Sequence, residues 1–373
     1  MPSSFSVLLR PLGLLYKGIV QSRNTLFDWR VLRSWKSPVP VVSIGNLSVG
    51  GTGKTPIVDW ITKYYLSVGV RPALISRGYR RESKGVQLVS DGRKILLGSR
   101  ESGDETAMLA WNNQDAVVLV AEKRKKGVRR LVRQFREQLP AVIILDDAFQ
   151  HRQIERELNI AVINAEEPYF DARMMPEGRL REPMANLERA DLVILNKIAN
   201  AEKAAPIVAD LEKKGKKVVQ ARLKTAELVC MSGAFCTQEE AVRKQSISAF
   251  AFAGIARPEG FIESLQQEGI HVADYTFFKD HEPYTERMLR KIERKASEQG
   301  LSLVTTEKDY FRLLGRPELI RILTSRPCYY LRIGIDFFAG RETLVTMLDS
   351  VVGRQNRIIE ESSTLPSRFS KWT

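Results

Sequence analysis

The 373-residue sequence predicts an α/β protein built from two domains with largely parallel sheets. Short apolar runs alternate with helical patterns in both halves of the chain, which is typical of parallel α/β units. Between the two halves, residues 216–235 have the pattern of short strands with little helix. The length is sufficient for two separate hydrophobic cores. We therefore expect two α/β domains joined by a short β linker.

The changes in sequence pattern along the chain also predict where the domains begin and end. The expected ranges are residues 1–25 for an N-terminal amphipathic helix, 26–214 for the first domain, 215–240 for the β linker, 241–352 for the second domain and 353–373 for a disordered tail. The tail is polar and lacks periodicity, which favours disorder. Strands are expected at residues 73–76, 116–121, 141–145, 160–164, 192–195, 248–253, 272–277, 301–305 and 328–335.

The N-terminal helix has one apolar and one polar face. Its apolar face contains Phe5, Leu8, Leu9, Leu12, Leu15, Tyr16 and Ile19, and its polar face contains Ser6, Arg10, Gly13, Lys17 and Gln21. Charges interrupt the apolar residues, so no uncharged stretch of about 18 residues is present that would span a bilayer. A helix of this kind suits a membrane interface, and it equally suits packing on the core of a domain. Both interpretations remain open from periodicity.

Residues 41–60 predict a strand, a phosphate-binding loop and a helix. Glycines allow backbone N–H groups to surround phosphate oxygens, the lysine of such a loop reaches the β- and γ-phosphates, and the next hydroxyl binds Mg²⁺. Ser48 stands where this motif usually begins with glycine. The expected nucleotide-binding residues are Ser48, Val49, Gly50, Gly51, Thr52, Gly53, Lys54 and Thr55, with Thr55 also a candidate magnesium ligand.

Further polar groups follow the strands of the first domain. Asp146 and Asp147 follow strand 141–145, and carboxylates delivered beside a phosphate loop are candidate Mg²⁺ ligands. The Arg77-Gly78-Tyr79 turn follows strand 73–76, and Arg124 follows strand 116–121. In open α/β sheets ligands bind at the carboxyl ends of strands, so these side chains are candidates for ligand binding. The alternative for each basic segment is a solvated surface.

The net charge of +14 calls for an anionic partner or surface. Nucleic acid, an anionic membrane and a phosphorylated substrate would each account for it. The basic segment 123–136 contains only Phe135 as an aromatic residue and no nucleic-acid motif is present, so we do not expect nucleic-acid binding. Asn196-Lys197 lacks the aspartate of the guanine-reading N-K-x-D motif, because Ala199 occupies that position. The three cysteines have no metal-ligand spacing and are expected to be free thiols.

Several segments, taken in order, resemble the tetraacyldisaccharide 4′-kinase family, membrane-associated kinases of the lipid A pathway of Gram-negative bacteria. The segments are SIGNLSVGGTGKTP (43–56), SRGY (76–79), GDE (103–105), DDAFQH (146–151), LREP (180–183), FAGIARPEGF (252–261), KDH (279–281) and TTEKDYFRL (305–313). The resemblance extends from the N-terminal helix to about residue 350. These segments together, in this order, are more specific for the family than any one of them alone.

The resemblance implies a P-loop NTPase-like first domain and a smaller, Rossmann-like second domain. It implies ATP- and Mg²⁺-dependent phosphorylation of the 4′-hydroxyl of a tetraacyldisaccharide 1-phosphate, giving lipid IVA, by a peripheral protein at the cytoplasmic face of the inner membrane. The implied roles are Asp104 as base with His281 as its partner, Lys54 on the phosphates, and Arg77, Gly78, Tyr79, Arg124 and Arg181 on the substrate. Because His281 lies in the second domain, closure of the domains would complete the catalytic pair.

Four positions depart from the pattern of the family. Ala148 replaces a usual glycine, Glu177 and Arg179 replace a small residue and a proline, and Glu282 replaces a frequent second histidine. None of these changes removes a group that the chemistry requires. The alternative function is a P-loop ATPase or GTPase that acts as a switch or metallochaperone.

Overall fold

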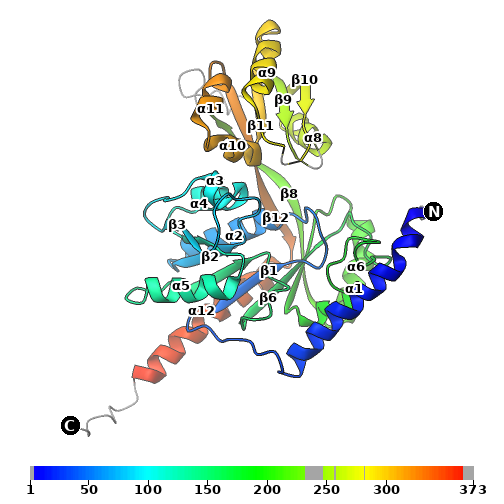
Figure 1. The fold of residues 1–373 in the computed structure, drawn as a ribbon, viewed down its shortest axis with the longest axis vertical. Coiled ribbons are helices and arrows are strands. Elements are labelled where there is room, and N and C mark those ends of the chain that lie inside the picture. Colours follow the sequence, from blue (N-terminus) through cyan, green and yellow to red (C-terminus); the bar gives the residue numbers. More distant parts are fainter. Residues whose placement is uncertain (1–3, 232–246, 256–257, 281, 364–373) are drawn as a thin grey trace.

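The computed structural model describes residues 4–231, 247–255, 258–280 and 282–363 of the chain. Within these residues the strands form one twelve-stranded sheet of order β10-β9-β11-β12-β8-β7-β6-β1-β5-β2-β4-β3. Figure 1 shows a large lower lobe and a smaller upper lobe, which the long strands β8 and β12 connect. Most neighbouring strands are parallel, which confirms the predicted α/β class.

The first lobe contains the N-terminal half of the sheet. Its strands are β1 (Val41–Gly45), β2 (Pro72–Ser76), β3 (Gln87–Asp91), β4 (Val117–Val120), β5 (Val142–Asp146), β6 (Leu158–Asn164), β7 (Leu192–Asn196) and β8 (Lys217–Cys230). Its helices are α1 (Ser4–Asp28), α2 (Lys54–Ser67), α3 (Ser99–Ser102), α4 (Asp104–Asn112), α5 (Arg124–Gln134) and α6 (Ala201–Lys213), with a 3₁₀ helix at Met184–Arg189. The short strand β3, which the sequence did not predict, pairs antiparallel with β4 at the edge of the sheet.

The second lobe repeats the α/β arrangement on a smaller scale. Its elements are β9 (Ser248–Ala253), α8 (Glu259–Gln267), β10 (His271–Phe277), α9 (Glu286–Glu298), β11 (Ser302–Thr306), α10 (Glu307–Leu314) and α11 (Pro317–Leu323). Strands β10, β9, β11 and β12 pair in parallel, so the described part of this lobe has the predicted Rossmann-like sheet.

The long strand β12 (Cys328–Ala339) carries the chain back to the first lobe. It pairs antiparallel with β8 along most of its length, and α12 (Arg341–Ser363) follows it. Leu344, Leu348 and Val351 of α12 are buried in the core that also contains Ile61 of α2. The segment after about residue 335 therefore belongs to the first lobe, although the sequence placed residues 241–352 in the second. The pattern of single elements did not reveal that one strand spans both lobes.

The tail also differs from the expectation. Helix α12 continues to Ser363, so residues 353–363 are helical and not disordered, and residues 364–373 lie outside the described part. Residues 354–363 contain neither glycine nor proline, the two residues that most strongly oppose a helix. The polar composition of this segment therefore does not prevent it from extending α12.

Helix α1 runs along the side of the first lobe (Figure 1). Part of its predicted apolar face is exposed and forms an outward stripe. Leu12, Leu15 and Ile19 of this stripe are 54%, 63% and 61% exposed. On the opposite side, Gly13 is buried, and a Cβ there would lie 3.6 Å from the carbonyl oxygen of Met174. Among the described residues, no helix is long and apolar enough to cross a bilayer.

The expectation for the cysteines holds for one described residue and is wrong for another. Cys328, at the start of β12, is a thiol outside any disulfide and has no exposed surface, and burial raises the pKa of this thiol. Cys230, at the end of β8, is disulfide-bonded. Cys230 is only partly buried, and the spacing of the cysteines along the chain does not reveal which thiols meet in space.

Candidate active site

The phosphate loop connects the central strand β1 to helix α2, as the sequence predicts. Gly50 and Gly53 adopt positive φ angles of 116° and 74°, a conformation that glycine adopts without strain. Lys54 is the first residue of α2, and its Nζ lies 2.9 Å from Asn46 Oδ1 and 3.2 Å from Asp147 Oδ1. The lysine is therefore held at the base of the loop, beside the end of β5.

Asn196 supports this loop from the end of strand β7, which lies two strands away from β1 in the sheet. Its Nδ2 donates a hydrogen bond of 2.9 Å to the carbonyl oxygen of Thr52, and the asparagine has no exposed surface. A Cβ on Gly53 would lie 2.4 Å from the same nitrogen, so the close packing requires glycine at this position. Asn196 therefore braces the phosphate loop.

The predicted carboxylate pair lies at the end of β5, next to β1. Strand β5 pairs in parallel with β1, and this pairing places Asp146 opposite Ile44. Ile44 lies near the end of β1, just before the phosphate loop. Ser76 Oγ donates a hydrogen bond of 2.8 Å to Asp146 Oδ2. Burial and then the negative charge of Asp147 raise the pKa of Asp146 to about 6. The side chain is 7% exposed, so its environment favours the neutral form more than water does.

Asp147 has the opposite electrostatic environment. Its backbone adopts a φ of 48°, which is uncommon for a residue other than glycine. Burial opposes ionisation, but the Lys54 ammonium and the Arg181 guanidinium hold the pKa of Asp147 well below its usual range. The positive φ falls on Asp147 and not on Ala148, so alanine is tolerated where the family usually has glycine.

The oxygen donors at this edge suit Mg²⁺. Thr55 supplies a hydroxyl and Asp146 a carboxylate, and hard oxygen ligands are those that Mg²⁺ prefers. Asp147 is already paired with two cations, Lys54 at 3.2 Å and Arg181 at 3.1 Å. The described residues contain no cluster of three or more His, Cys, Asp or Glu side chains suited to a metal. This donor set therefore fits an ion that obtains its remaining ligands from nucleotide phosphates and water.

The Arg77-Gly78-Tyr79 turn contacts the start of helix α4, where Asp104 lies. Gly103 precedes the helix with a φ of 84°, and a Cβ there would lie 2.8 Å from the carbonyl oxygen of Tyr79. Arg77 is exposed and Tyr79 is 57% exposed. The structure thus brings the turn predicted for substrate binding into backbone contact with the helix that carries the predicted base.

Asp104 forms an ion pair with the second lobe. Its Oδ2 lies 3.2 Å from Nε of Arg312, a residue of α10. The Arg312 Nη1 also lies 2.9 Å from Oδ1 of Asp309, a residue with no exposed surface. His281, the predicted partner of Asp104, lies outside the described residues, so its pairing with Asp104 stays a prediction.

The two other predicted substrate arginines have different environments. Arg124 is 1% exposed, and its guanidinium donates to the carbonyl oxygens of Ala121 and Asp146 at 2.8 and 2.6 Å. Burial lowers the pKa of Arg124 to about 10, so it remains charged at neutral pH. In this structure its guanidinium ties the end of β4 to the end of β5. Arg181 contacts Asp147 instead, at the open side of the phosphate loop.

A cavity of about 1010 Å³ lies between the lobes. Gly51 and Thr55 line it from the phosphate loop and Glu105 from α4. Phe261 of α8 and Lys308 of α10 line it from the second lobe. This volume is sufficient for a nucleotide, since small-molecule sites commonly enclose about 300–1,000 Å³. The phosphate loop therefore opens into the space between the two lobes.

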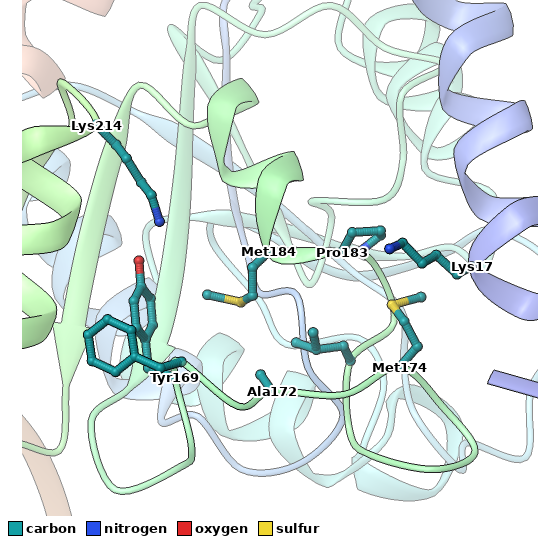
Figure 2. A pocket seen from close by; sticks show the side chains of 9 residues that line it. Lys17, Tyr169, Ala172, Met174, Pro183, Met184 and Lys214 are labelled. Atoms are coloured by element: carbon teal, nitrogen blue, oxygen red, sulfur yellow. The ribbon is translucent and has the colours of Figure 1, made fainter. Parts of the chain in front are cut away.

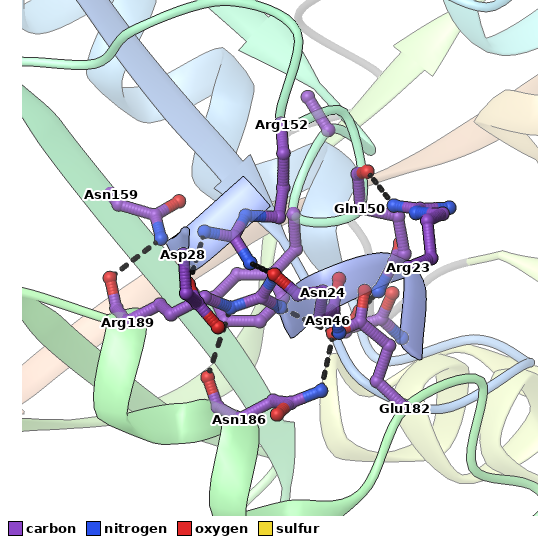
Figure 3. A network of polar contacts seen from close by, with 12 residues as sticks. Arg23, Asn24, Asp28, Asn46, Gln150, Arg152, Asn159, Glu182, Asn186 and Arg189 are labelled. Carbon is purple, nitrogen blue, oxygen red and sulfur yellow. Dashed lines mark hydrogen bonds and ion pairs between the residues drawn. The ribbon is translucent and has the colours of Figure 1, made fainter. Parts of the chain in front are cut away.

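Polar contacts connect the C-terminal part of α1 to the same site (Figure 3). Arg23 donates to the carbonyl oxygen of Gln150 at 2.6 Å, and Gln150 Nε2 donates to the carbonyl oxygen of Asn46 at 2.8 Å. Asn24 Nδ2 donates to Glu182, which is 1% exposed, at 3.1 Å. Since Asn46 also accepts from Lys54, α1 is connected to the lysine of the phosphate loop through two residues, Gln150 and Asn46.

Four supporting residues of the site were not predicted from the sequence. They are Asn46, Ser76, Asn196 and Arg312, which contact Lys54, Asp146, Thr52 and Asp104 respectively. Asn46, Ser76 and Arg312 lie inside the segments SIGNLSVGGTGKTP, SRGY and TTEKDYFRL, so motif membership was the available signal. Asn196 was considered only as part of a guanine-reading motif. Its supporting role depends on the contact in space between the end of β7 and the phosphate loop, which lie far apart in the sequence. The local sequence does not show this contact.

The chain matches a family model over most of its length. The model describes tetraacyldisaccharide-1-P 4′-kinase, and it matches residues 5–353. A tetraacyldisaccharide 4′-kinase of Pelodictyon phaeoclathratiforme is 64% identical over 352 residues, which cover 94% of this chain and 99% of the relative. A protein of the same name from Chlorobium chlorochromatii is 60% identical over 352 residues, covering 94% of this chain and 95% of the relative.

A solved structure shares the fold. The "apo" form of LpxK from Aquifex aeolicus in complex with ATP superposes with a TM-score of 0.73 at 29% sequence identity. The similarity covers 93% of this chain and 99% of the other. The predicted arrangement of a P-loop domain and a second α/β domain thus agrees with an experimentally determined relative.

Proposed function

The chain belongs to the tetraacyldisaccharide-1-P 4′-kinase family, and we infer that it transfers the γ-phosphate of ATP to the 4′-hydroxyl of a tetraacyldisaccharide 1-phosphate, giving lipid IVA. It is a kinase of lipid A biosynthesis. The observation that carries the mechanism is that the phosphate loop and the Asp104 helix line one interlobe space, while the carboxylate pair lies beside the loop at the end of β5. Each element supplies a different requirement of phosphoryl transfer.

We propose that Asp104 is the general base. A sugar hydroxyl is a weak nucleophile, so a positioned carboxylate assists by accepting its proton in the transition state. The 4′-oxygen forms a bond to the γ-phosphorus, its proton passes to Asp104, and the bond between this phosphorus and the β–γ bridging oxygen breaks to release ADP. Contact of Gly103 with the 77–79 turn supports this role, because it places the base beside exposed groups suited to a sugar phosphate. By family resemblance, His281 assists Asp104.

Lys54 and the backbone of residues 48–55 bind the phosphates in this proposal. The lysine is held between Asn46 and Asp147, so its charge is available beside the loop without rearrangement of the backbone. Thr55 and Asp146 would hold Mg²⁺, with Asp147 as the alternative carboxylate. When bound, the ion would neutralise charge on the phosphate oxygens. The main contribution of the chain is therefore positioning and charge neutralisation, which phosphoryl transfer chiefly requires.

We propose that arginine and tyrosine side chains at this edge of the sheet bind the head group of the lipid. Arg77 and Tyr79 are exposed, and Arg181 is held at the site by Asp147. Gly78 allows the 77–79 turn its positive φ of 68°. Arg124 supports the same edge through Asp146, and a direct contact with substrate would require its guanidinium to leave two carbonyl oxygens. We assign the direct contacts to Arg77, Tyr79 and Arg181.

We also propose that α1 lies in the cytoplasmic interface of the inner membrane as a monotopic anchor. Its exposed stripe of Leu12, Leu15 and Ile19 supports this proposal, because an unpaired apolar stripe gains free energy by entering lipid. The polar contacts of Arg23 and Asn24 hold the other side of the helix on the first lobe. The lipid substrate could then stay partly in the membrane while its head group reaches the site.

A small pocket beside α1 suits part of an acyl chain (Figure 2). Its volume is about 250 Å³, and the lining is mostly apolar. Lys17 of α1 and Lys214 approach the pocket from opposite sides, with Met174 and Met184 between them. Apolar walls with cations at the rim match a lipid whose chains and anionic head group are adjacent.

The rival function is a nucleotide switch that hydrolyses ATP or GTP without a lipid acceptor. Nucleotide turnover by the purified protein, measured with and without tetraacyldisaccharide 1-phosphate, separates the two. The kinase proposal predicts that ADP release depends on the lipid and occurs with ATP in preference to GTP. Equal turnover in the absence of lipid would support the switch.

A further inference from the structure

Arg179 and Arg181 lie on the same side of a short strand-like segment that pairs with the phosphate loop. Leu180 forms an antiparallel bridge with Ser48, and the backbone N–H of Val49 donates to the carbonyl oxygen of Arg179 at 2.7 Å. Side chains alternate along an extended segment, so the two arginines point to one side and Leu180 to the other. Leu180 is 6% exposed and packs in the core. The arginines therefore face the open side of the loop.

Arg179 lies directly on the mouth of the phosphate loop. Its Nε donates a hydrogen bond of 3.0 Å to the carbonyl oxygen of Val49. A Cβ added to Gly50 would lie only 1.7 Å from Arg179 Nη2, which is shorter than any non-bonded contact. The guanidinium can take this position only because residue 50 is glycine. Arg181 approaches from the same segment and pairs with Asp147.

A carboxylate holds Arg179 in this position through a weak ion pair. Arg179 Nη1 lies 3.4 Å from Glu167 Oε1, and the arginine side chain is 50% exposed. Glu167 also accepts from Ser48 Oγ and Asn164 Nδ2, each at 3.3 Å, so it is anchored independently of the arginine. A long, half-exposed ion pair contributes little free energy. A phosphate group offers a guanidinium stronger, bidentate hydrogen bonds.

The surroundings of Arg179 are those of the nucleotide site. Arg179 and Glu167 line the interlobe cavity together with Gly51 and Thr55 of the phosphate loop. Lys54, on the first turn of α2, is the other cation of this loop. Phosphoryl transfer spreads negative charge over the equatorial oxygens of the moving group, and a second cation stabilises that charge.

We propose that Arg179 is a catalytic residue that binds the γ-phosphate of the nucleotide and stabilises its charge during transfer. Glu167 holds the guanidinium beside Gly50 when no nucleotide is bound and releases it to the phosphate. This inference rests on the proposed kinase function, because it assigns the cation to the ATP site. It adds an arginine supplied by the 178–182 segment to the groups of the phosphate loop itself.

The test compares two arginines of the same surface loop. Arg173 is 49% exposed and pairs with Glu177 at 2.5 Å, so it matches the exposure and ion pairing of Arg179, but it is not among the residues that line the interlobe cavity. The variants are Arg179→Ala, Arg179→Lys and Arg173→Ala in the full-length protein. The first readout is the affinity for ATP and for ADP by calorimetric titration without lipid. The second is kcat and KM for phosphate transfer with lipid.

We expect Arg179→Ala to weaken ATP binding by at least about tenfold, the effect of losing one hydrogen bond to a charged group. ADP binding should change much less, because ADP lacks the γ-phosphate. The value of kcat should also fall, Arg179→Lys should recover part of both losses, and Arg173→Ala should match the wild type. Equal ATP affinity and kcat in Arg179→Ala and Arg173→Ala would overturn the proposal. Equal losses for ATP and ADP, with a lower Tm, would indicate a structural role and would also overturn it.

The same titrations separate this inference from the kinase function. If the wild-type protein binds ATP but transfers no phosphate to the lipid, the proposed function fails. The ATP and ADP affinities of the variants would still show whether Arg179 contacts the γ-phosphate. If transfer occurs and Arg179→Ala binds both nucleotides like the wild type, only the role of Arg179 fails.

Discussion

Arg312 of the second lobe forms an ion pair with Asp104 of the first lobe, with 3.2 Å between Nε and Oδ2. The two residues are 208 positions apart in the sequence. Arg312 also donates to the carbonyl oxygen of Gly254 at 3.2 Å and pairs with Asp309, so its guanidinium is fixed on the second lobe. The orientation of the proposed base therefore depends on the position of one lobe relative to the other.

Replacing Asp104 by Asn should abolish most of the catalysis while leaving the fold intact. The amide keeps the shape of the side chain but cannot accept the proton of the sugar hydroxyl, so we expect kcat to fall by about 10²–10⁴-fold. ATP affinity should stay close to that of the wild type, because the phosphate loop is unchanged. The control is Asp115→Asn, an exposed aspartate beyond the other end of α4. Wild-type kcat in Asp104→Asn would exclude the role of base.

Replacing Arg312 by Met should lower the free energy of unfolding. The change leaves Asp309, which has no exposed surface, without its cation, although Gly254 N–H and Thr306 Oγ still donate to it at 3.1 and 2.7 Å. We expect a loss of about 3 kcal/mol, the scale for removing one partner of a buried ion pair.

The control for Arg312 is Arg294→Met. Arg294 is 81% exposed and pairs with Glu298 on the surface of α9, where an ion pair contributes about 0–1 kcal/mol. Urea titration of both variants gives the two free energies. Equal losses would show that the buried Arg312–Asp309 pair contributes no more to stability than a surface ion pair.

His151 should make the protein less stable as the solution becomes mildly acidic. Burial and then the charges of Arg124 and Arg156 lower the pKa of His151 to about 4 in the folded chain, against 6.5 for the free side chain. Between these values the unfolded state binds more protons, so stability falls as the pH decreases from about 6.5 to about 4. The difference corresponds to roughly 3 kcal/mol across that interval.

His151→Gln should remove this part of the pH dependence. Unfolding free energies measured between pH 4 and pH 8 test this, with the exposed His271→Gln as control. We expect the slope below pH 6.5 to be shallower in His151→Gln than in the wild type and unchanged in His271→Gln. Identical slopes in the wild type and in His151→Gln would contradict the assignment.

Polar substitution of the outward stripe of α1 should weaken membrane binding. Leu15→Asn combined with Ile19→Asn replaces two side chains that are 63% and 61% exposed. Each contributes about 1.5–3 kcal/mol when it enters an apolar phase, so partitioning should fall at least tenfold. The measurement is cosedimentation with vesicles of phosphatidylethanolamine and phosphatidylglycerol. Val68→Asn, an exposed apolar residue after α2, is the control. Equal partitioning of all three proteins would argue against an anchoring role.

The sequence predicted the elements of this site that depend on local pattern. Residues 41–60 contain the strand, the glycines and the lysine of the phosphate loop within one segment, and Asp146 follows an apolar strand that the fold then places beside β1. Pairs distant in sequence were not predictable from such patterns. The Arg312–Asp104 ion pair requires the relative position of two lobes, and the contact of Arg179 with Gly50 requires the pairing of Leu180 with Ser48.

The return of the chain through β12 was missed for a related reason. The pattern of residues 328–335 indicates a strand, but not that the strand continues to Ala339 and delivers α12 to the core of the first lobe. Leu344 and Leu348 are apolar at a helical spacing, which fits a core position in either lobe. Only the antiparallel pairing of β12 with β8 determines which core they join.

The most direct test of the central claim is the position of the transferred phosphate. Purified full-length protein is incubated with γ-labelled ATP, Mg²⁺ and tetraacyldisaccharide 1-phosphate, and the lipid product is analysed by ³¹P–¹H correlation NMR. We predict a new phosphate monoester on the 4′-oxygen in the wild type, and its near absence in Asp104→Asn. Release of the label as inorganic phosphate, or its attachment to another oxygen, would contradict the account.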